Sequence, residues 1–232
     1  MTEYVFAPPA VVSLPVVGSD RQFPVRRVYC VGRNYVEHAK EMGFTGREDP
    51  FFFSKPADAL LVIPDGTQGK MPYPSKTQNL HYEMELVVAL GKGGRDIPVD
   101  KANECIFGYA LGLDMTRRDL QGEAKKLGRP WEVGKAFDFG GPIGPLHPVS
   151  KTGILENGEI SLEVNGEIKQ KSNLDKLIWS IPESISYLSG LFELKAGDLI
   201  FTGTPEGVGA VVKGDRMVGK FAGLGQLEVV MV

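Results

Sequence analysis

The sequence predicts a mixed α/β, β-rich fold in which a mixed β-sheet is rolled up and short helices lie at its periphery. Short apolar runs rich in β-branched and aromatic residues recur along the chain, as expected for strands. The 29 glycines fall mostly between these runs, which favours a rolled sheet over a doubly wound one. The length of 232 residues, without an internal repeat, indicates one large domain.

The first quarter of the chain predicts an arm followed by alternating strands and a helix. Residues 1–25 carry four prolines and are expected to form an extended arm, with the folded domain spanning 26–232. A short strand is expected over 26–31. A helix over 34–42 is predicted to be capped by Asn34 and ended by Gly43. Strands over 51–54 and 59–63 follow, divided by Lys55-Pro56.

The remaining elements follow from apolar periodicity and turn residues. The stretch 64–80 is expected to be a loop, and Asn165-Gly166 is the strongest hairpin signal in the chain. Pro182 is expected to open a helix that runs to about residue 191. The other predicted helices lie near 99–105 and over 117–127. The other predicted strands are 82–90, 106–113, 160–164, 167–171, 198–203, 216–221 and 226–232.

The charge and hydropathy of the chain argue against nucleic-acid and membrane partners, and its cysteines indicate the compartment. Lys and Arg together number 26 against 29 acidic residues, a formal net charge of −3, which gives no basic footprint for nucleic acid. No apolar run approaches the roughly 18 residues that a membrane helix needs. Cys30 and Cys105 lie in or next to apolar runs, as expected for buried thiols in a reducing compartment. We therefore expect a cytoplasmic protein with neither a nucleic-acid nor a membrane partner.

Three acidic residues next to two apolar runs form the strongest candidate site. Glu83 and Glu85 are two positions apart in a predicted strand, so both side chains point to one face. Asp114 follows the run 106–113 and joins them if the two strands pair. Carboxylates this close repel one another unless a cation binds between them. Oxygen-only ligands select Mg²⁺ or Mn²⁺, with Ca²⁺ also compatible. The alternative is that the glutamates face solvent on an edge strand.

A second candidate site lies on the predicted helix 34–42. His38 and Glu41 are three positions apart and so share a helix face. A carboxylate beside an imidazole fixes its tautomer and raises its basicity, as a general base requires. The spacing alone equally describes an ordinary surface pair.

Two glycine-rich segments carry further candidates. In 134–145, Lys135 is bracketed by glycine, aromatic and proline residues, which indicates either an anchored cation or a surface-loop lysine. In 201–209, glycines let backbone N–H groups approach an anion, and Thr204 adds a hydroxyl. The alternative is a tight turn after a strand, since the phosphate-loop pattern is missing.

These segments, in this order, resemble the fumarylacetoacetate hydrolase family. The resemblance covers about residues 26–232 and implies that this domain has the family's rolled catalytic fold. The matching segments are Gly32-Arg33-Asn34-Tyr35 with His38 and Glu41, Tyr82-Glu83-Met84-Glu85-Leu86, 113–121, Lys135-Ala136-Phe137-Asp138 and 202–209. The family's separate N-terminal domain has no counterpart here, so the chain is closer to the short acylpyruvate-hydrolase branch.

The resemblance also implies roles for individual residues. Glu83, Glu85 and Asp114 are expected to hold Mg²⁺ or Mn²⁺, and the helix bearing His38 and Glu41 is expected to close over bound substrate as a catalytic pair. Lys135 is expected to stabilise negative charge that develops on oxygen. The residues expected to line the metal and substrate pocket are Arg118, Gln121, Lys135 and Thr204. For a distal carboxylate, the candidate cations are Arg33, Arg118 and Arg129.

The activity that this branch implies is metal-dependent hydrolysis of the C–C bond of a 2,4-dioxo acid by a homodimer. Within the branch, the chain is similar to members that cleave fumarylpyruvate to fumarate and pyruvate in gentisate breakdown. Three other functions remain open. One is oxaloacetate decarboxylation, and a second is isomerisation or decarboxylation of 2-hydroxyhepta-2,4-diene-1,7-dioate in homoprotocatechuate breakdown. The third is a regulatory or scaffold role that keeps the metal without catalysis.

Overall fold

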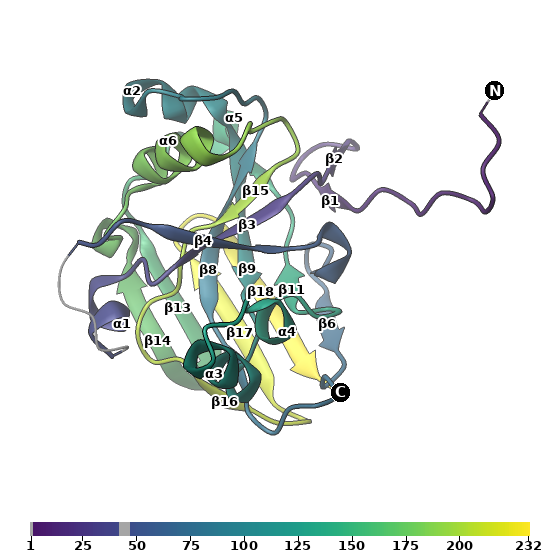
Figure 1. The fold of residues 1–232 in the computed structure, drawn as a ribbon, viewed down its shortest axis with the longest axis vertical. Coiled ribbons are helices and arrows are strands. Elements are labelled where there is room, and N and C mark those ends of the chain that lie inside the picture. The colour runs from purple at the N-terminus through teal and green to yellow at the C-terminus, as the bar shows by residue number, and fades with distance from the viewer. Residues whose placement is uncertain (1, 42–46) are drawn as a thin grey trace.

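A computed structural model of the chain describes residues 2–41 and 47–232 and confirms the β-rich mixed fold (Figure 1). Its largest sheet has eight strands and is mixed, because β3 pairs in parallel with β15 and β5 with β11, whereas the other pairs are antiparallel. Strand β12 (His147–Pro148) pairs with β9 beside the main order. That order is β4 (Phe51–Lys55), β3 (Val28–Gly32), β15 (Leu199–Phe201), β8 (Met84–Leu90), β9 (Ile106–Leu113), β11 (Gly141–Ile143) and β5 (Leu60–Val62).

Three smaller sheets complete the roll. The Asn165-Gly166 turn joins the first two strands of a five-stranded sheet, as predicted, and both turn residues have positive φ. The order is β14 (Glu167–Asn173), β13 (Glu159–Val164), β17 (Arg216–Phe221), β18 (Gly225–Met231) and β6 (Gln68–Met71). A three-stranded sheet has the order β10 (Thr116–Arg117), β7 (Leu80–Tyr82) and β16 (Gly209–Val211). A hairpin is formed by β1 (Ser13–Pro15) and β2 (Gln22–Pro24).

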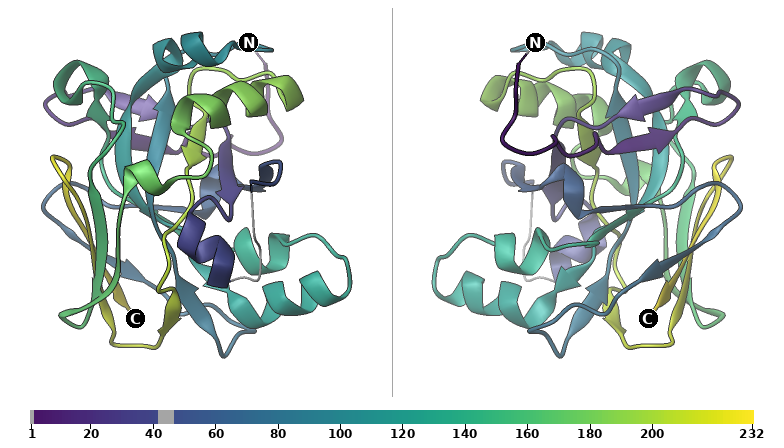
Figure 2. Two further views of the ribbon diagram at one scale, coloured as in Figure 1. Left: turned by 90° about the vertical axis from the view of Figure 1, so that its left-hand side faces the viewer. Right: turned by 90° about the vertical axis from the view of Figure 1, so that its right-hand side faces the viewer.

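The helices are short and lie around the sheets. Helix α6 starts with a capping box between Ser180 and Glu183, which satisfies the free N–H groups of its first turn. Helices α3 and α4 pack together and, with α1, lie at one end of the molecule (Figure 2). The α-helices are α1 (Val36–Glu41), α2 (Val99–Ala102), α3 (Arg118–Lys126), α4 (Glu132–Lys135), α5 (Val149–Thr152) and α6 (Ile181–Leu191). The 3₁₀ turns are η1 (Ala57–Ala59), η2 (Asn103–Cys105) and η3 (Leu174–Lys176). Within the described ranges, none of these helices has the length and apolarity needed to cross a bilayer.

Strand β8 is buried on both faces, and each face contacts a different core. Leu86 and Val88 point into the larger core, which extends to β13 and β17 of the five-stranded sheet. Val87 and Ala89 point into a smaller core shared with the β1–β2 hairpin. Because strand side chains alternate, the predicted metal-binding acids lie on the same side of the sheet as the smaller core.

The structure corrects the predicted boundaries in several places. The expected loop over 64–80 contains β6, which pairs in parallel with β18, and the start of β7. The predicted strand 82–90 is divided, and Glu83 lies between β7 and β8. Strands β1, β2, β10, β11, β12 and β16 and helices α4 and α5 were not predicted, because two to four residues carry too little periodicity. The extended arm expected over 1–25 is therefore wrong for residues 13–24, which contain the β1–β2 hairpin.

The predicted helix cap at Asn34 is also wrong. The helix begins at Val36, and the Asn34 amide instead bonds to the segment before α6. Its Nδ2 donates to the Trp179 and Thr202 carbonyls, and its Oδ1 accepts the Trp179 N–H at 2.8 Å. Asn34 therefore ties α1 to the main sheet rather than capping it. The predicted end of this helix, Met42 with Gly43, lies outside the described residues.

Candidate active site and metal centre

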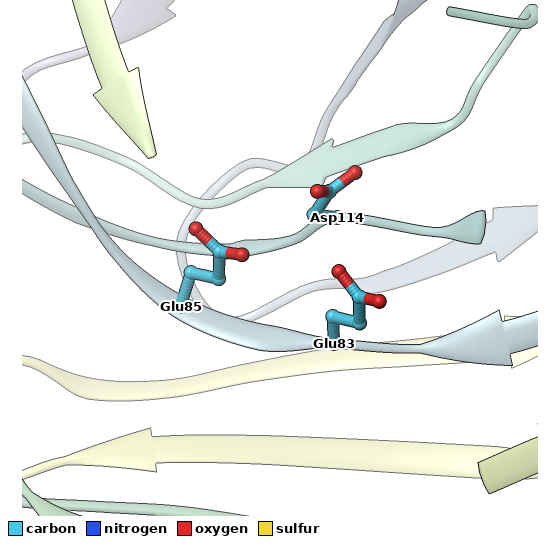
Figure 3. A group of neighbouring side chains, drawn as sticks. All are labelled: Glu83, Glu85 and Asp114. Atoms are coloured by element: carbon cyan, nitrogen blue, oxygen red, sulfur yellow. The ribbon is translucent and has the colours of Figure 1, made fainter. Parts of the chain in front are cut away.

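The three predicted metal ligands converge in the structure (Figure 3). Asp114 directly follows β9, and its backbone N–H donates to the Glu83 carbonyl at 2.8 Å. Pairing of β8 with β9 thus sets Asp114 beside Glu83, with Glu85 further along β8 on the same face. All three side chains are buried, and one ligand atom from each lies within 4.8 Å of the others. The alternative of solvent-facing acids on an edge strand is excluded.

Three cationic side chains surround the acids. Lys135 Nζ donates to Glu83 Oε2 at 2.6 Å and to Asp114 Oδ2 at 2.7 Å. Arg118 donates to the other Glu83 oxygen and, at 2.7 Å, to the Gln121 amide oxygen. Lys55 Nζ lies 2.9 Å from Asp114 Oδ1. Lys135 is therefore an anchored cation, not a surface-loop lysine, and it lies at the end of helix α4 rather than in a turn.

The pKa values of the two glutamates move in opposite directions. Burial alone raises the pKa of Glu83, but the charges of Lys135, Arg118 and His38 outweigh it and hold that pKa below its usual range. The pKa of Glu85 is raised well above its usual value, first by burial and then by the charges of Asp114 and Glu83. The Gly203 N–H, 2.7 Å from Glu85 Oε2, and the charge of Lys135 oppose that rise.

This arrangement fits a hard divalent cation. The donor set is three carboxylates, which is the chemistry that Mg²⁺ and Mn²⁺ prefer. Asp114 Oδ1 is buried and accepts no hydrogen bond of good geometry, although Lys55 Nζ is close enough for an ion pair. A positive ion between the acids would also remove the repulsion that raises the pKa of Glu85.

The acids line a cavity, and most of the other predicted site residues line the same cavity. Arg33 and His38 line it from the segment after β3 and from α1, and Arg118 and Gln121 line it from α3. Thr204 lines it too, while its hydroxyl donates to the Met84 carbonyl at 2.9 Å. The predicted site therefore comes together in space from segments far apart in the sequence.

Of two further predicted residues, one has a side chain outside the described part of the structure and the other lies away from the cavity. The side chain of Glu41 lies outside the described part of the structure, so its pairing with His38 stays a prediction. Arg129, one candidate for a distal carboxylate, is exposed and does not line the cavity.

Two lysines at the site were missed by the sequence reading. Lys55 ends the apolar strand β4, and it also donates to the backbone carbonyls of Met115 and Lys135. Lys125 lines the cavity from α3, four residues after Gln121 and seven after Arg118, and this helical spacing was the available signal. Its Nζ lies 4.9 Å from the centre of the Trp131 ring. Burial, followed by the charges of Arg118 and Arg33, lowers the pKa of Lys125 to about 8.

Comparison with known proteins identifies relatives along nearly the whole chain. The family model described as fumarylacetoacetate (FAA) hydrolase C-terminal matches residues 27–232. A fumarylpyruvate hydrolase from Ralstonia sp is 48% identical over 182 residues, covering 78% of this chain and 92% of the relative. A mitochondrial oxaloacetate decarboxylase from Dictyostelium discoideum is 44% identical, covering 82% and 85%. The crystal structure of fumarylpyruvate hydrolase from Pseudomonas aeruginosa in complex with Mn²⁺ and pyruvate is 60% identical, with a TM-score of 0.98 and 99% of each chain covered.

Proposed function

We propose that this chain, which belongs to the fumarylacetoacetate hydrolase family, is a metal-dependent hydrolase that cleaves fumarylpyruvate to fumarate and pyruvate. The observation that carries the proposal is the buried cluster of Glu83, Glu85 and Asp114 beside Lys135. A solved relative that is 60% identical, and is named for this reaction, contains Mn²⁺ and pyruvate.

We assign metal binding to Glu83, Glu85 and Asp114. When bound, Mg²⁺ or Mn²⁺ supplies Lewis-acid stabilisation of negative charge on the oxygens of the pyruvate half of the substrate. Lys135 keeps its proton, because Asp114 and Glu83 raise its pKa against the effect of burial. Its ammonium is thus a fixed positive charge next to the reacting oxygens. Gln121 and Thr204 add polar groups to the same wall.

We assign activation of water to His38, with Glu41 as its partner. In the proposed reaction the imidazole takes a proton from water while the water oxygen attacks the C4 carbonyl. The bond between C3 and C4 then breaks, and its electron pair leaves with the pyruvate half as an enolate. Protonation of that enolate at C3 gives pyruvate, and the C4 fragment leaves as fumarate. His38 is buried and lines the cavity that holds the acids, as this role requires.

We assign recognition of the distal carboxylate to Lys125 in place of Arg118 and Arg129, while Arg33, which lines the same cavity, stays a second candidate. Arg118 is committed to Glu83 and Gln121, and Arg129 lies outside the cavity. No carboxylate of the described residues forms an ion pair with Lys125. Its ammonium beside the Trp131 ring therefore leaves a positive group and a flat apolar surface for an unsaturated acid.

The proposal is tested with purified protein and four substrates, each with and without Mn²⁺. The substrates are fumarylpyruvate, acetylpyruvate, oxaloacetate and 2-hydroxyhepta-2,4-diene-1,7-dioate, and the products are identified by chromatography. We expect metal-dependent release of fumarate and pyruvate to have the highest kcat/KM. A higher kcat/KM for oxaloacetate would instead assign the activity named for the Dictyostelium relative. No turnover of any of them would favour a non-catalytic metal-binding role.

The proposal also covers the compartment, the oligomeric state and the pathway of the enzyme. We expect the enzyme to act as a cytoplasmic homodimer in the breakdown of gentisate. Growth of the source cells on gentisate, with and without the gene, checks this, since loss of the enzyme would leave fumarylpyruvate unconsumed.

A further inference from the structure

We propose that His81 is a positioning residue of the active site, which fixes the guanidinium of Arg118 and, through it, the carboxylate of Glu83. Arg118 lines the cavity and His81 does not, so His81 acts on the site from behind. This role rests on the metal binding proposed above for Glu83.

Strand pairing brings His81 to Arg118. In the register of β7 and β10, His81 lies opposite Thr116, two residues before Arg118 begins α3. Nε of Arg118 donates to Nδ1 of the His81 ring at 3.4 Å. Nη1 of the same guanidinium donates to Gln121 and Nη2 donates to Glu83. Each nitrogen atom of this planar group therefore has an acceptor, which holds the group in one orientation.

The two ring nitrogens of His81 have different tasks. Arg118 can only donate, so Nδ1 of the ring is the acceptor of that bond. Nε2 lies 2.9 Å from the side-chain oxygen of Asn79, which can only accept, so Nε2 carries the proton. The two partners thus select one neutral tautomer, and this tautomer presents a lone pair to the guanidinium.

The segment that carries His81 is attached to the start of α3 at three further points. The Asp119 carboxylate accepts the Thr77 hydroxyl at 2.6 Å and the Gln78 N–H at 2.9 Å. The backbone carbonyl of Asn79 accepts the Arg118 N–H at 2.8 Å. Because these bonds hold the two backbones together, the His81 ring acts on the guanidinium from a fixed position.

Glu83 depends on that position because its carboxylate lies between two cations. Lys135 holds one oxygen at 2.6 Å, and Arg118 holds the other. If the guanidinium turned, Glu83 would lose this second partner and its carboxylate would be free to rotate away from the other two acids. Loss of a group directly behind a metal ligand lowers metal affinity roughly 10–100-fold, and His81 is one step further out, so we expect a loss of about five- to tenfold.

The first test measures Mn²⁺ affinity by calorimetry, a readout that does not involve turnover. His81→Leu is compared with His81→Asn, because the two replacements have the same shape and only Asn keeps an acceptor near the place of Nδ1. We expect His81→Leu to raise the Kd for Mn²⁺ about five- to tenfold and His81→Asn to raise it less than twofold. His147→Leu, at a half-buried histidine of β12 away from the cavity, controls for loss of an imidazole and should leave the Kd unchanged. Circular dichroism checks the fold of each variant.

The second test asks whether His81 acts through Arg118. Arg118→Lys keeps a positive charge but has no N–H at the place of Nε. In that background, His81→Leu should change the Kd for Mn²⁺ less than twofold, because the bond that it removes is already missing.

The third test needs no variant, so it decides even if the His81 variants fail to fold. Heteronuclear NMR of the histidine ring nitrogens in metal-free protein distinguishes the two neutral tautomers, and we expect the His81 proton on Nε2. A proton on Nδ1 would overturn the proposal. So would an unchanged Kd in His81→Leu, equal losses in His81→Leu and His81→Asn, or an undiminished loss in Arg118→Lys. A parent protein that binds no Mn²⁺ would instead refute the proposed metal site.

Discussion

Replacing Lys125 by Met should lower kcat/KM for fumarylpyruvate by about 10- to 30-fold. The substitution keeps the length and apolar stem of the side chain and removes its charge. A hydrogen bond to a charged group contributes roughly 1.5–3 kcal/mol, and the half-buried position of Lys125 leaves some solvent screening, which favours about 1.5–2 kcal/mol. That loss converts to the stated factor at about 1.4 kcal/mol per tenfold change.

The matched control is Lys126→Met, because Lys126 is the next residue of α3 and is exposed. The assay follows loss of the ultraviolet absorbance of the substrate's conjugated enol, with fumarylpyruvate and with acetylpyruvate, which has no second carboxylate. We expect Lys125→Met to change kcat/KM for acetylpyruvate less than threefold. Equal losses for both substrates, or no loss for either, would refute the assignment of Lys125 to the distal carboxylate.

The same assignment fixes a pH dependence. Burial and the neighbouring Arg118 and Arg33 lower the pKa of Lys125 to about 8, so its ammonium is charged below that pH and loses its charge above it. Because kcat/KM reports the free enzyme, its value for fumarylpyruvate should fall as the pH rises through about 8. This alkaline limb should be missing for acetylpyruvate and in Lys125→Met. A limb of equal size in all cases would assign it to another group.

Three further predictions concern the metal and the chemistry. His38→Ala should slow fumarylpyruvate cleavage by roughly 10²–10⁴-fold. It should slow oxaloacetate decarboxylation much less, because that reaction needs no activated water. Asp114→Ala should slow both reactions, because both need the metal. Equal slowing of both reactions by His38→Ala would remove its assignment as the base. Mn²⁺ at 100 times its Kd should raise the free energy of unfolding by about 2.7 kcal/mol in the parent protein and much less in Glu85→Gln, as measured by thermal melts. Lys55→Met should lower the free energy of unfolding of metal-free protein by about 3 kcal/mol in denaturant titrations, since it leaves Asp114 Oδ1 without its ion pair; a loss under 1 kcal/mol would contradict this.

The part of the site that follows from strand periodicity was predictable. Alternation alone places Glu83 and Glu85 on one face, and the long runs that become β8 and β9 are the clearest strands in the chain. Their pairing, which brings Asp114 to the glutamates, is a contact between neighbours in sequence, and such strands usually pair.

The parts that depend on distant partners were not predictable. The Asn34 side chain bonds to Trp179, which is 145 residues away, and nothing near Asn34 in the sequence indicates that contact. Lys55 follows an aromatic run, so in the sequence it looks like the polar end of a strand. Its partner Asp114 follows a different strand, and nothing near Lys55 in the sequence indicates that contact. Lys125 sits in a helix of mostly polar residues, and only packing of α3 against α4 turns its face towards the cavity.

The two-sided burial of β8 has a consequence for how such a protein changes during evolution. A shift of one residue in β8 would exchange the acids for Met84 and Leu86 and place charges in the larger core, so insertions there are not tolerated. Lys125 of α3 and Trp131, directly before α4, line the cavity from a part of the chain that meets solvent. Substitutions on these helices change which acid fits without disturbing the sheet. Two relatives, 44% and 48% identical to this chain, are named for different reactions.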